Sequence, residues 1–236
     1  MEFPPRVVSR SAHFALHEVF TPGDVHCRVP TMRGKYDRSQ TTEQRHEATR
    51  ERVLDAATDV FAKLSVVATR VDDLVEAAGI SRRTLYELWA SVPDVLDAVY
   101  ERAVRISFQQ VFESLVGITD PIERIHAGVR AYYRIIADNP NAARVVFVEY
   151  RYAGPAQAAK YELNTTRYAG LLLEFLNAAF AAKRLARAPD ETSAYALTRA
   201  LEAVGVRGLS RGENLAELAP KMSTLILEAF RVTDSA

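Results

Sequence analysis

The sequence has little cysteine and no long apolar runs, and each shortage excludes a class of protein. Cys27 is the only cysteine among 236 residues, which excludes an internal disulfide framework and zinc sites built from several thiolates. No charge-free apolar stretch reaches the roughly 18–20 residues that a membrane-spanning helix needs, and the N-terminal region lacks the pattern of a secretory signal. We therefore expect a soluble, cytoplasmic protein without a metal or other cofactor.

The sequence also lacks an excess of either charge. Its 30 basic residues are balanced by 30 acidic ones, so the chain has no global positive field that could hold nucleic acid through phosphate neutralisation alone. Any contact with DNA must then be local and oriented. Apolar residues are abundant, at 48% of the chain, and they suffice for one large core or two smaller ones.

From residue 41 onward the pattern predicts an all-α fold. Apolar residues recur at three- and four-residue spacing, without alternating β-branched runs. Pairs that suit N-terminal capping separate the helices: Thr41 with Gln44, Thr69 with Asp72, Ser91 with Asp94, Asp120 with Glu123 and Asn214 with Glu217. We expect about nine helices, near 43–64, 70–77, 81–89, 92–116, 121–137, 140–152, 156–185, 190–208 and 214–232.

The chain divides into three parts. Residues 1–40 contain four prolines and no sustained period, so we expect a flexible extension, with Met32 as an alternative start. A metal site there is the weaker interpretation of His13, His17, His26 and Cys27. We assign 41–92 to a DNA-binding domain and 93–236 to a larger helical domain that binds an effector and dimerises.

Two short helices in the DNA-binding domain are joined by a tight turn. Gly79 ends the first, where a left-handed residue is easiest to accommodate, and Ser81 caps the second. This arrangement is typical of a helix-turn-helix, whose second helix enters the major groove. At about 100° per residue the core side of that helix consists of Leu85, Leu88 and Trp89, and its outer side of Arg83, Tyr86 and Glu87.

Residues 53–96 resemble the DNA-binding domain of the TetR family of repressors. The positions that match its usual pattern without a gap are Thr69, Val71, Asp73, Leu74, Ala78, Gly79, Ser81, Thr84, Leu85, Tyr86, Trp89, Ser91 and Leu96. The resemblance implies that the start of the second helix reads bases while Thr69 and Tyr86 hold phosphates. The implied DNA-binding set is Thr69, Arg70, Ser81, Arg82, Arg83, Thr84 and Tyr86.

Arg82 and Arg83 are the predicted readers, because an arginine fork suits guanine O6 and N7. The alternative is that both contact phosphates only. Glu87 either accepts from a cytosine or holds Arg83 in position, and we favour the second role.

The resemblance is not complete. Where the family usually has glycine, glycine, histidine and lysine, this chain has Ser65, Arg83, Leu88 and Val92. Residues 41–92 carry seven basic and nine acidic side chains. We therefore expect weak non-specific affinity for DNA, and Leu88 and Val92 raise the question of whether operator binding is weakened as well.

Residues 97–236 contain no catalytic or metal-binding signature, so we do not expect an enzyme. Their resemblance to the family is architectural only. Tyrosines and phenylalanines interleaved with polar residues suit a pocket with an apolar wall; filling of a helical core is the alternative for each. The predicted lining consists of Tyr133, Phe147, Tyr150, Asn164, Tyr168 and Phe175.

The last two predicted helices carry apolar and small residues on one side, which suggests a homodimer interface. Its predicted members are Leu201, Val204, Gly205, Gly208, Met222, Leu225 and Ile226. The alternative is that these stripes cover the chain's own pocket.

Two functions remain open. One is a repressor that binds a palindromic operator on double-stranded DNA as a homodimer and is released by a small hydrophobic or aromatic effector. The other is a TetR-like small-molecule binding or interaction protein with weak or lost operator affinity.

Overall fold

The computed structural model describes residues 42–231. Over this range every regular element is helical and no strand occurs, so the predicted all-α fold is confirmed. The predicted metal-site alternative and the flexible extension lie outside the described residues.

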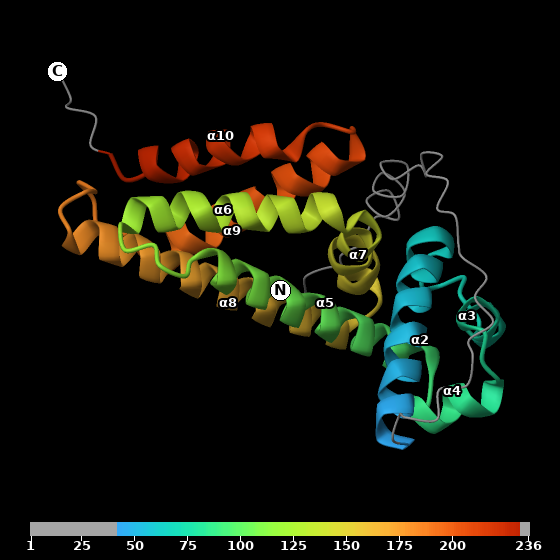
Figure 1. The fold of residues 1–236 in the computed structure, drawn as a ribbon. Coiled ribbons are helices and arrows are strands. Elements are labelled where there is room, and N and C mark those ends of the chain that lie inside the picture. Colours follow the sequence, from blue (N-terminus) through green and yellow to red (C-terminus); the bar gives the residue numbers. More distant parts are fainter. Residues whose placement is uncertain (1–41, 232–236) are drawn as a thin grey trace, which may run out of the picture.

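A small three-helix unit lies at one end of the molecule (Figure 1). It consists of α2 (Thr42–Leu64), α3 (Val71–Ala78) and α4 (Arg82–Leu88). The first two predicted helices differ from these bounds by one residue at most. Val53, Ala57 and Phe61 of α2 are completely buried in a core that includes residues of α3 and α4.

The remaining helices form an elongated bundle (Figure 1). They are α5 (Val92–Ser114), α6 (Pro121–Asp138), α7 (Pro140–Arg144), the π-helix η1 (Val145–Tyr150), α8 (Pro155–Ala181), α9 (Glu191–Ser210) and α10 (Leu215–Glu228). The predicted single helix at 140–152 is interrupted by the π-helical turns of η1. Such turns often lie at functional sites.

Of the predicted caps, Thr41 lies outside the described residues, and the others follow the prediction with one correction. Ser81, Ser91 and Asp120 accept hydrogen bonds from backbone N–H groups in the first turns of α4, α5 and α6. Thr69 and Asp72 do not pair as predicted: α3 is capped at Arg70, whose backbone N–H donates to Asp73 Oδ2 at 2.7 Å.

Two turns of the small unit use left-handed backbone. Gly79 ends α3 with φ 62°, as predicted. Ser65, immediately after α2, adopts φ 67° although it has a side chain. A glycine at that position would avoid the steric cost of this conformation.

Two hydrophobic cores fill the molecule, and one of them joins the small unit to the bundle. It combines residues of α2, α3 and α4 with Val95, Val99 and Tyr100 of α5 and with Val145 and Tyr150 of η1. The second core lies among α6, α8, α9 and α10. The small unit therefore rests on the near end of the bundle, where α2 contacts α5, α7 and η1.

Candidate nucleic-acid interface and ligand pocket

Helix α4 presents the predicted faces. Leu85 is 2% exposed and Trp89, just after the helix, is 7% exposed, so both belong to the core. The side chain of Arg83 is 89% exposed, and Tyr86 is also exposed. The helix therefore offers Arg83 and Tyr86 to solvent on the side opposite the core.

Both predicted readers are held by carboxylates. Arg82 Nε donates to Asp72 Oδ1 at 2.7 Å, and Arg83 Nε donates to Glu87 Oε1 at 2.9 Å. These hydrogen bonds, followed by the negative charges, raise the pKa of both guanidinium groups. Exposed ion pairs contribute little free energy, so a phosphate or base edge can replace either carboxylate.

Other predicted DNA contacts differ in accessibility. Arg70 is exposed, and the hydroxyls of Ser81 and Thr84 lie 2.9 Å apart near the surface. Thr69 is buried, and its hydroxyl donates to the carbonyl of Ser65 at 2.7 Å. In this conformation the Thr69 hydroxyl is occupied by the backbone and cannot donate to a phosphate.

Leu88 and Val92, which replace the usual histidine and lysine, are half-buried and pack against the core of the small unit. These two side chains cannot make polar contacts, and they pack against apolar neighbours instead.

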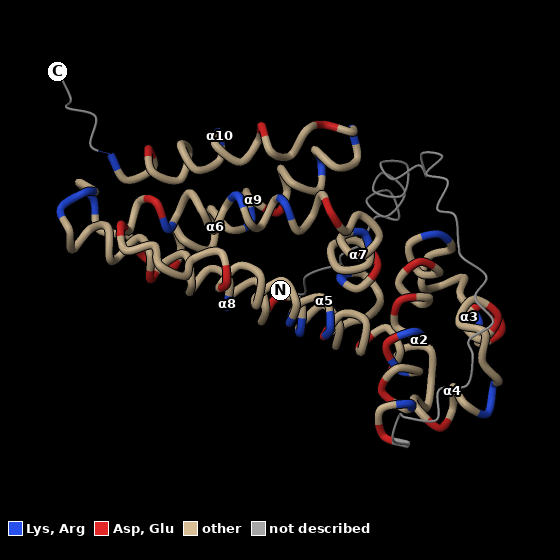
Figure 2. The backbone as a smooth tube through the Cα atoms, viewed as in Figure 1, with Lys and Arg blue, Asp and Glu red and all other residues tan. Residues whose placement is uncertain are grey.

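Figure 2 shows acidic positions along α2 and on α3 among the basic ones, in accordance with the near balance of charge in this region.

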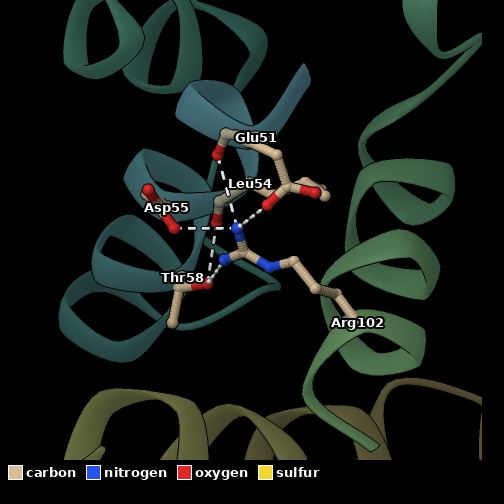
Figure 3. A network of polar contacts seen from close by, with 5 residues as sticks. All are labelled: Glu51, Leu54, Asp55, Thr58 and Arg102. Atoms are coloured by element: carbon tan, nitrogen blue, oxygen red, sulfur yellow. Dashed lines mark hydrogen bonds and ion pairs between the residues drawn. The ribbon is translucent and has the colours of Figure 1, made fainter. Parts of the chain in front are cut away.

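Arg102 of α5 connects the bundle to α2 (Figure 3). Its Nη1 donates to Glu51 Oε2 at 2.9 Å and to Asp55 Oδ1 at 2.7 Å, and its Nη2 lies 3.5 Å from Thr58 Oγ1. The side chain is only 13% exposed. Sequence reasoning missed this network, because nothing in the pattern pairs residues that lie 44 to 51 positions apart.

Two further contacts join α2 and its following turn to the bundle. Asn141 of α7 donates to Asp59 of α2 at 2.8 Å. Glu149 of η1 accepts from the backbone N–H of Val66 at 3.0 Å and from Arg144 Nη2 at 3.4 Å. Glu149 and Arg144 are both buried, so a buried ion pair of the bundle holds the turn after α2.

A cavity of about 590 Å³ lies between α2 and the bundle. Residues of α2, α5, α6, α7, η1, α8 and α9 line it. Tyr132, Phe147 and Tyr168 supply aromatic wall, and the buried residues Tyr161, Asn164 and Glu202 supply polar groups in the interior. Because α2 forms part of the lining, a molecule in this cavity would contact the support of the candidate DNA-binding helices directly.

A smaller apolar cavity of about 60 Å³ adjoins the first. Both cavities are lined by Tyr132, Tyr168 and Thr198. The rings of Tyr132 and Tyr168 meet edge to face at 6.0 Å. Burial raises the pKa of Tyr168 to about 12, although its hydrogen bond with Ser107 lowers it. This hydroxyl is therefore neutral at physiological pH.

The structure brings only some of the predicted lining residues to the larger cavity. Phe147, Asn164 and Tyr168 line it, whereas Phe175 lines the smaller one. Tyr133 and Tyr150 line neither cavity, so their assignment to the pocket lining was wrong. Their rings are fully buried: Tyr133 donates to the carbonyl of Leu201 at 3.1 Å, and Tyr150 stacks on Tyr100 at 3.6 Å and donates to Asp97.

The interior contains a charged cluster that sequence reasoning missed. Glu202 lies 3.0 Å from Arg199 and 3.5 Å from Arg151. Burial, followed by the charge of Glu202, raises the pKa of the nearby Tyr161. The buried Tyr161 hydroxyl nevertheless makes no hydrogen bond of normal geometry with Glu202 or any other described residue.

Most of the predicted dimer residues lie inside the protomer. The residues buried there are Leu201, Gly205, Gly208, Met222 and Ile226. Gly205 lies against Tyr133 and Ile136 of α6, and Gly208 lies against α10. These glycines thus serve close packing within the chain, which corrects their assignment to a partner surface. Val204 is half-buried and Leu225 is exposed, so these two remain available.

The described residues contain neither a candidate membrane span nor a candidate metal cluster. Within 42–231 no helix is both long enough and apolar enough to cross a bilayer. Over the same range histidine, cysteine and acidic residues do not gather into a group that could hold a metal ion.

Two family models match the chain. Residues 53–99 match "Bacterial regulatory proteins, tetR family", and residues 119–227 match "Tetracyclin repressor-like, C-terminal domain". An uncharacterized HTH-type transcriptional regulator of Mycobacterium tuberculosis is 28% identical over 100 residues, which are 42% of this chain and 50% of that protein. The HTH-type transcriptional activator FasR of Mycolicibacterium smegmatis is 28% identical over 116 residues, 49% of this chain and 53% of its own length. The chain thus spans about half the length of these curated relatives.

Solved structures share the fold. The fatty acid degradation regulator FadR of Bacillus halodurans superposes with a TM-score of 0.72 at 20% identity, over 78% of this chain and 97% of that one. FadR of Bacillus subtilis in complex with stearoyl-CoA gives 0.69 at 16% identity, over 75% and 97%. With family models matching both its helix-turn-helix and its helical bundle, the chain belongs to the TetR family of transcriptional regulators.

Proposed function

We propose that this regulator represses transcription by binding a palindromic operator as a homodimer, and that a small hydrophobic or aromatic effector releases it. TetR regulators are DNA-binding proteins rather than enzymes. The exposed face of α4, with Arg83 and Tyr86, supports the DNA-binding part. Acting on DNA would place the protein in the cytoplasm.

The observation that carries the effector part is the position of the larger cavity. Its lining includes Asp55, Thr58 and Asp59 of α2 as well as residues deep in the bundle. A ligand there would compete for space with the contacts that join α2 to α5 and α7. In a dimer, paired recognition helices must meet major grooves about 34 Å apart, so a small movement of α2 would alter operator affinity.

The names of structural neighbours support an apolar effector. The FadR structure from Bacillus subtilis contains stearoyl-CoA, and a match of 28% identity is named as an activator. Operator affinity measured with and without the effector gives the direction of the response in this chain. A ligand releases DNA only if it binds the released conformation more tightly than the operator-bound one.

Selection of bound fragments from genomic DNA at low salt tests the DNA-binding part. We expect enrichment of one palindrome, and relaxed preference at one symmetric pair of positions in Arg83→Ala. If no palindrome is enriched, the repressor hypothesis is refuted, and the alternative of a small-molecule binding or interaction protein remains. An equal loss of affinity for all sequences in Arg83→Ala would make this residue a phosphate contact.

A further inference from the structure

The mouth of the larger cavity is acidic. Asp55, Asp59 and Asp138 line the cavity and are exposed, and Glu51 lies beside them, half-buried. Arg102 is the one cation among the described lining residues. It already forms ion pairs with Glu51 and Asp55. Negative charge at the mouth therefore exceeds positive charge.

Asp59 and Asp138 carry most of this excess. Asp59 accepts a hydrogen bond from Asn141 at 2.8 Å, and an amide donor leaves the charge of the carboxylate in place. Asp138 lies at the end of α6 and is exposed. Asp138 thus adds an exposed negative charge at the junction of α6 and α7.

The interior differs from the mouth. Tyr100, Tyr132, Phe147, Tyr161 and Tyr168 present aromatic surface, which suits an apolar body and attracts an organic cation through the ring faces. The buried carboxylate of Glu202 is balanced by two arginines, so selection by charge falls to the mouth.

A second, independent observation marks this cavity as a ligand site. Tyr161 is 4% exposed and lines the cavity, and its hydroxyl, which lies near the carboxylate of Glu202, makes no hydrogen bond of normal geometry with any described residue. Leaving a buried polar group without a partner costs free energy. A cationic ligand whose otherwise apolar body carries one acceptor atom, such as an ether oxygen, near Tyr161 would remove that cost.

We propose that the effector is an amphipathic organic cation, with its apolar body among the tyrosines and its positive group at Asp59 and Asp138. This inference rests on the proposed function, because it assigns a chemical class to the effector of the same cavity. An anionic head group at the mouth would face carboxylates with no unengaged cation among the described lining residues. This chain therefore differs in ligand charge from the neighbour solved with stearoyl-CoA.

Three compounds with one phenylbutyl body test the charge: a trimethylammonium, an alcohol and a carboxylate. Calorimetric titration of the full chain should give the tightest Kd for the ammonium, about tenfold below that of the carboxylate, with the alcohol between them. Raising the ionic strength should reduce the difference, because the mouth is exposed.

The double variant Asp59→Asn, Asp138→Asn locates the charge. It should weaken binding of the ammonium about fivefold and leave that of the alcohol unchanged, since asparagine at 59 still accepts from Asn141. Glu174→Gln is the matched control: it removes an exposed carboxylate that lines neither cavity, and it should change nothing.

The outcomes separate the two proposals. Equal or tighter binding of the carboxylate, or an ammonium affinity unchanged in the double variant, overturns the cationic effector and leaves the apolar pocket standing. If none of the three compounds binds, including the neutral alcohol, the cavity is not an effector site, and both the cationic effector and the proposed apolar effector are overturned.

Discussion

At the scale of single residues, Ser65 is a strained position that can be relieved. Its φ of 67° lies in the left-handed region. The side chain is half-buried, and no hydrogen bond of its hydroxyl to a described residue explains why a residue other than glycine stands there. Ser65→Gly should raise the free energy of unfolding by about 0.5–1 kcal/mol, measured in urea. Ser65→Ala keeps the strain and should give no gain; an equal gain in both variants would contradict the explanation.

Single residues also show which parts of the pocket lining could be predicted from the sequence. Composition identified a tyrosine-rich region, and Phe147, Asn164 and Tyr168 do line the cavity. Tyr133 and Tyr150 belong to the same region, but Tyr133 is hydrogen-bonded to the carbonyl of Leu201 and Tyr150 is stacked on Tyr100. Periodicity indicates which side of a helix is buried, but a cavity wall and a packed core give the same apolar signal.

At the scale of elements, close packing of α9 against α6 depends on Gly205. A Cβ there would lie 2.9 Å from Tyr133 Cε1 and 3.1 Å from Ile136 Cδ1. Tyr133 is fully buried and hydrogen-bonded, so it cannot move aside easily.

Gly205→Ala should therefore lower the free energy of unfolding by about 1–3 kcal/mol. Gly170→Ala is the matched control, because its Cβ would meet no atom within 4 Å; on an exposed helix it should gain up to about 1 kcal/mol. Urea unfolding distinguishes them, and a neutral Gly205→Ala would refute the packing argument.

The attachment of the small unit to η1 depends on Glu149. Glu149→Ala would remove the acceptor of the Val66 N–H and leave the buried Arg144 without this carboxylate. We expect a loss of roughly 3 kcal/mol in the free energy of unfolding and faster hydrogen exchange at Val66.

Glu149→Gln serves as the comparison for this contact. It keeps an oxygen acceptor, so the Val66 amide should remain protected although the ion pair is lost. If both variants expose that amide equally, the contact does not hold the turn.

The elements themselves were largely predictable, and their contacts were not. Capping at Ser81 and Asp120 and the glycine at 79 follow from local chemistry, so the bounds of the helices came close. Arg102 meets Glu51 only through the fold. The two glycines of the predicted dimer stripe were misassigned for the same reason, because Gly205 and Gly208 admit close neighbours within the protomer. Val204 and Leu225 stay candidates for the interface.

At the scale of the whole molecule, one continuous core joins the small unit to the near end of the bundle. The larger cavity lies at this junction, between α2 and the helices of the bundle. The ion pairs of Arg102 and the hydrogen bond of Asn141 cross the same junction. A ligand in the cavity and DNA on α4 would therefore act on one shared structural element, helix α2.

Thermodynamic linkage between these two ligands shows directly whether the cavity and the DNA-binding helix are coupled. The operator Kd is measured with and without a saturating effector, and the effector Kd is measured with free and operator-bound protein. We predict that the effector weakens operator binding by about tenfold or more, and that the operator weakens effector binding by the same factor. An effector that binds the cavity while the operator Kd stays unchanged would contradict the account.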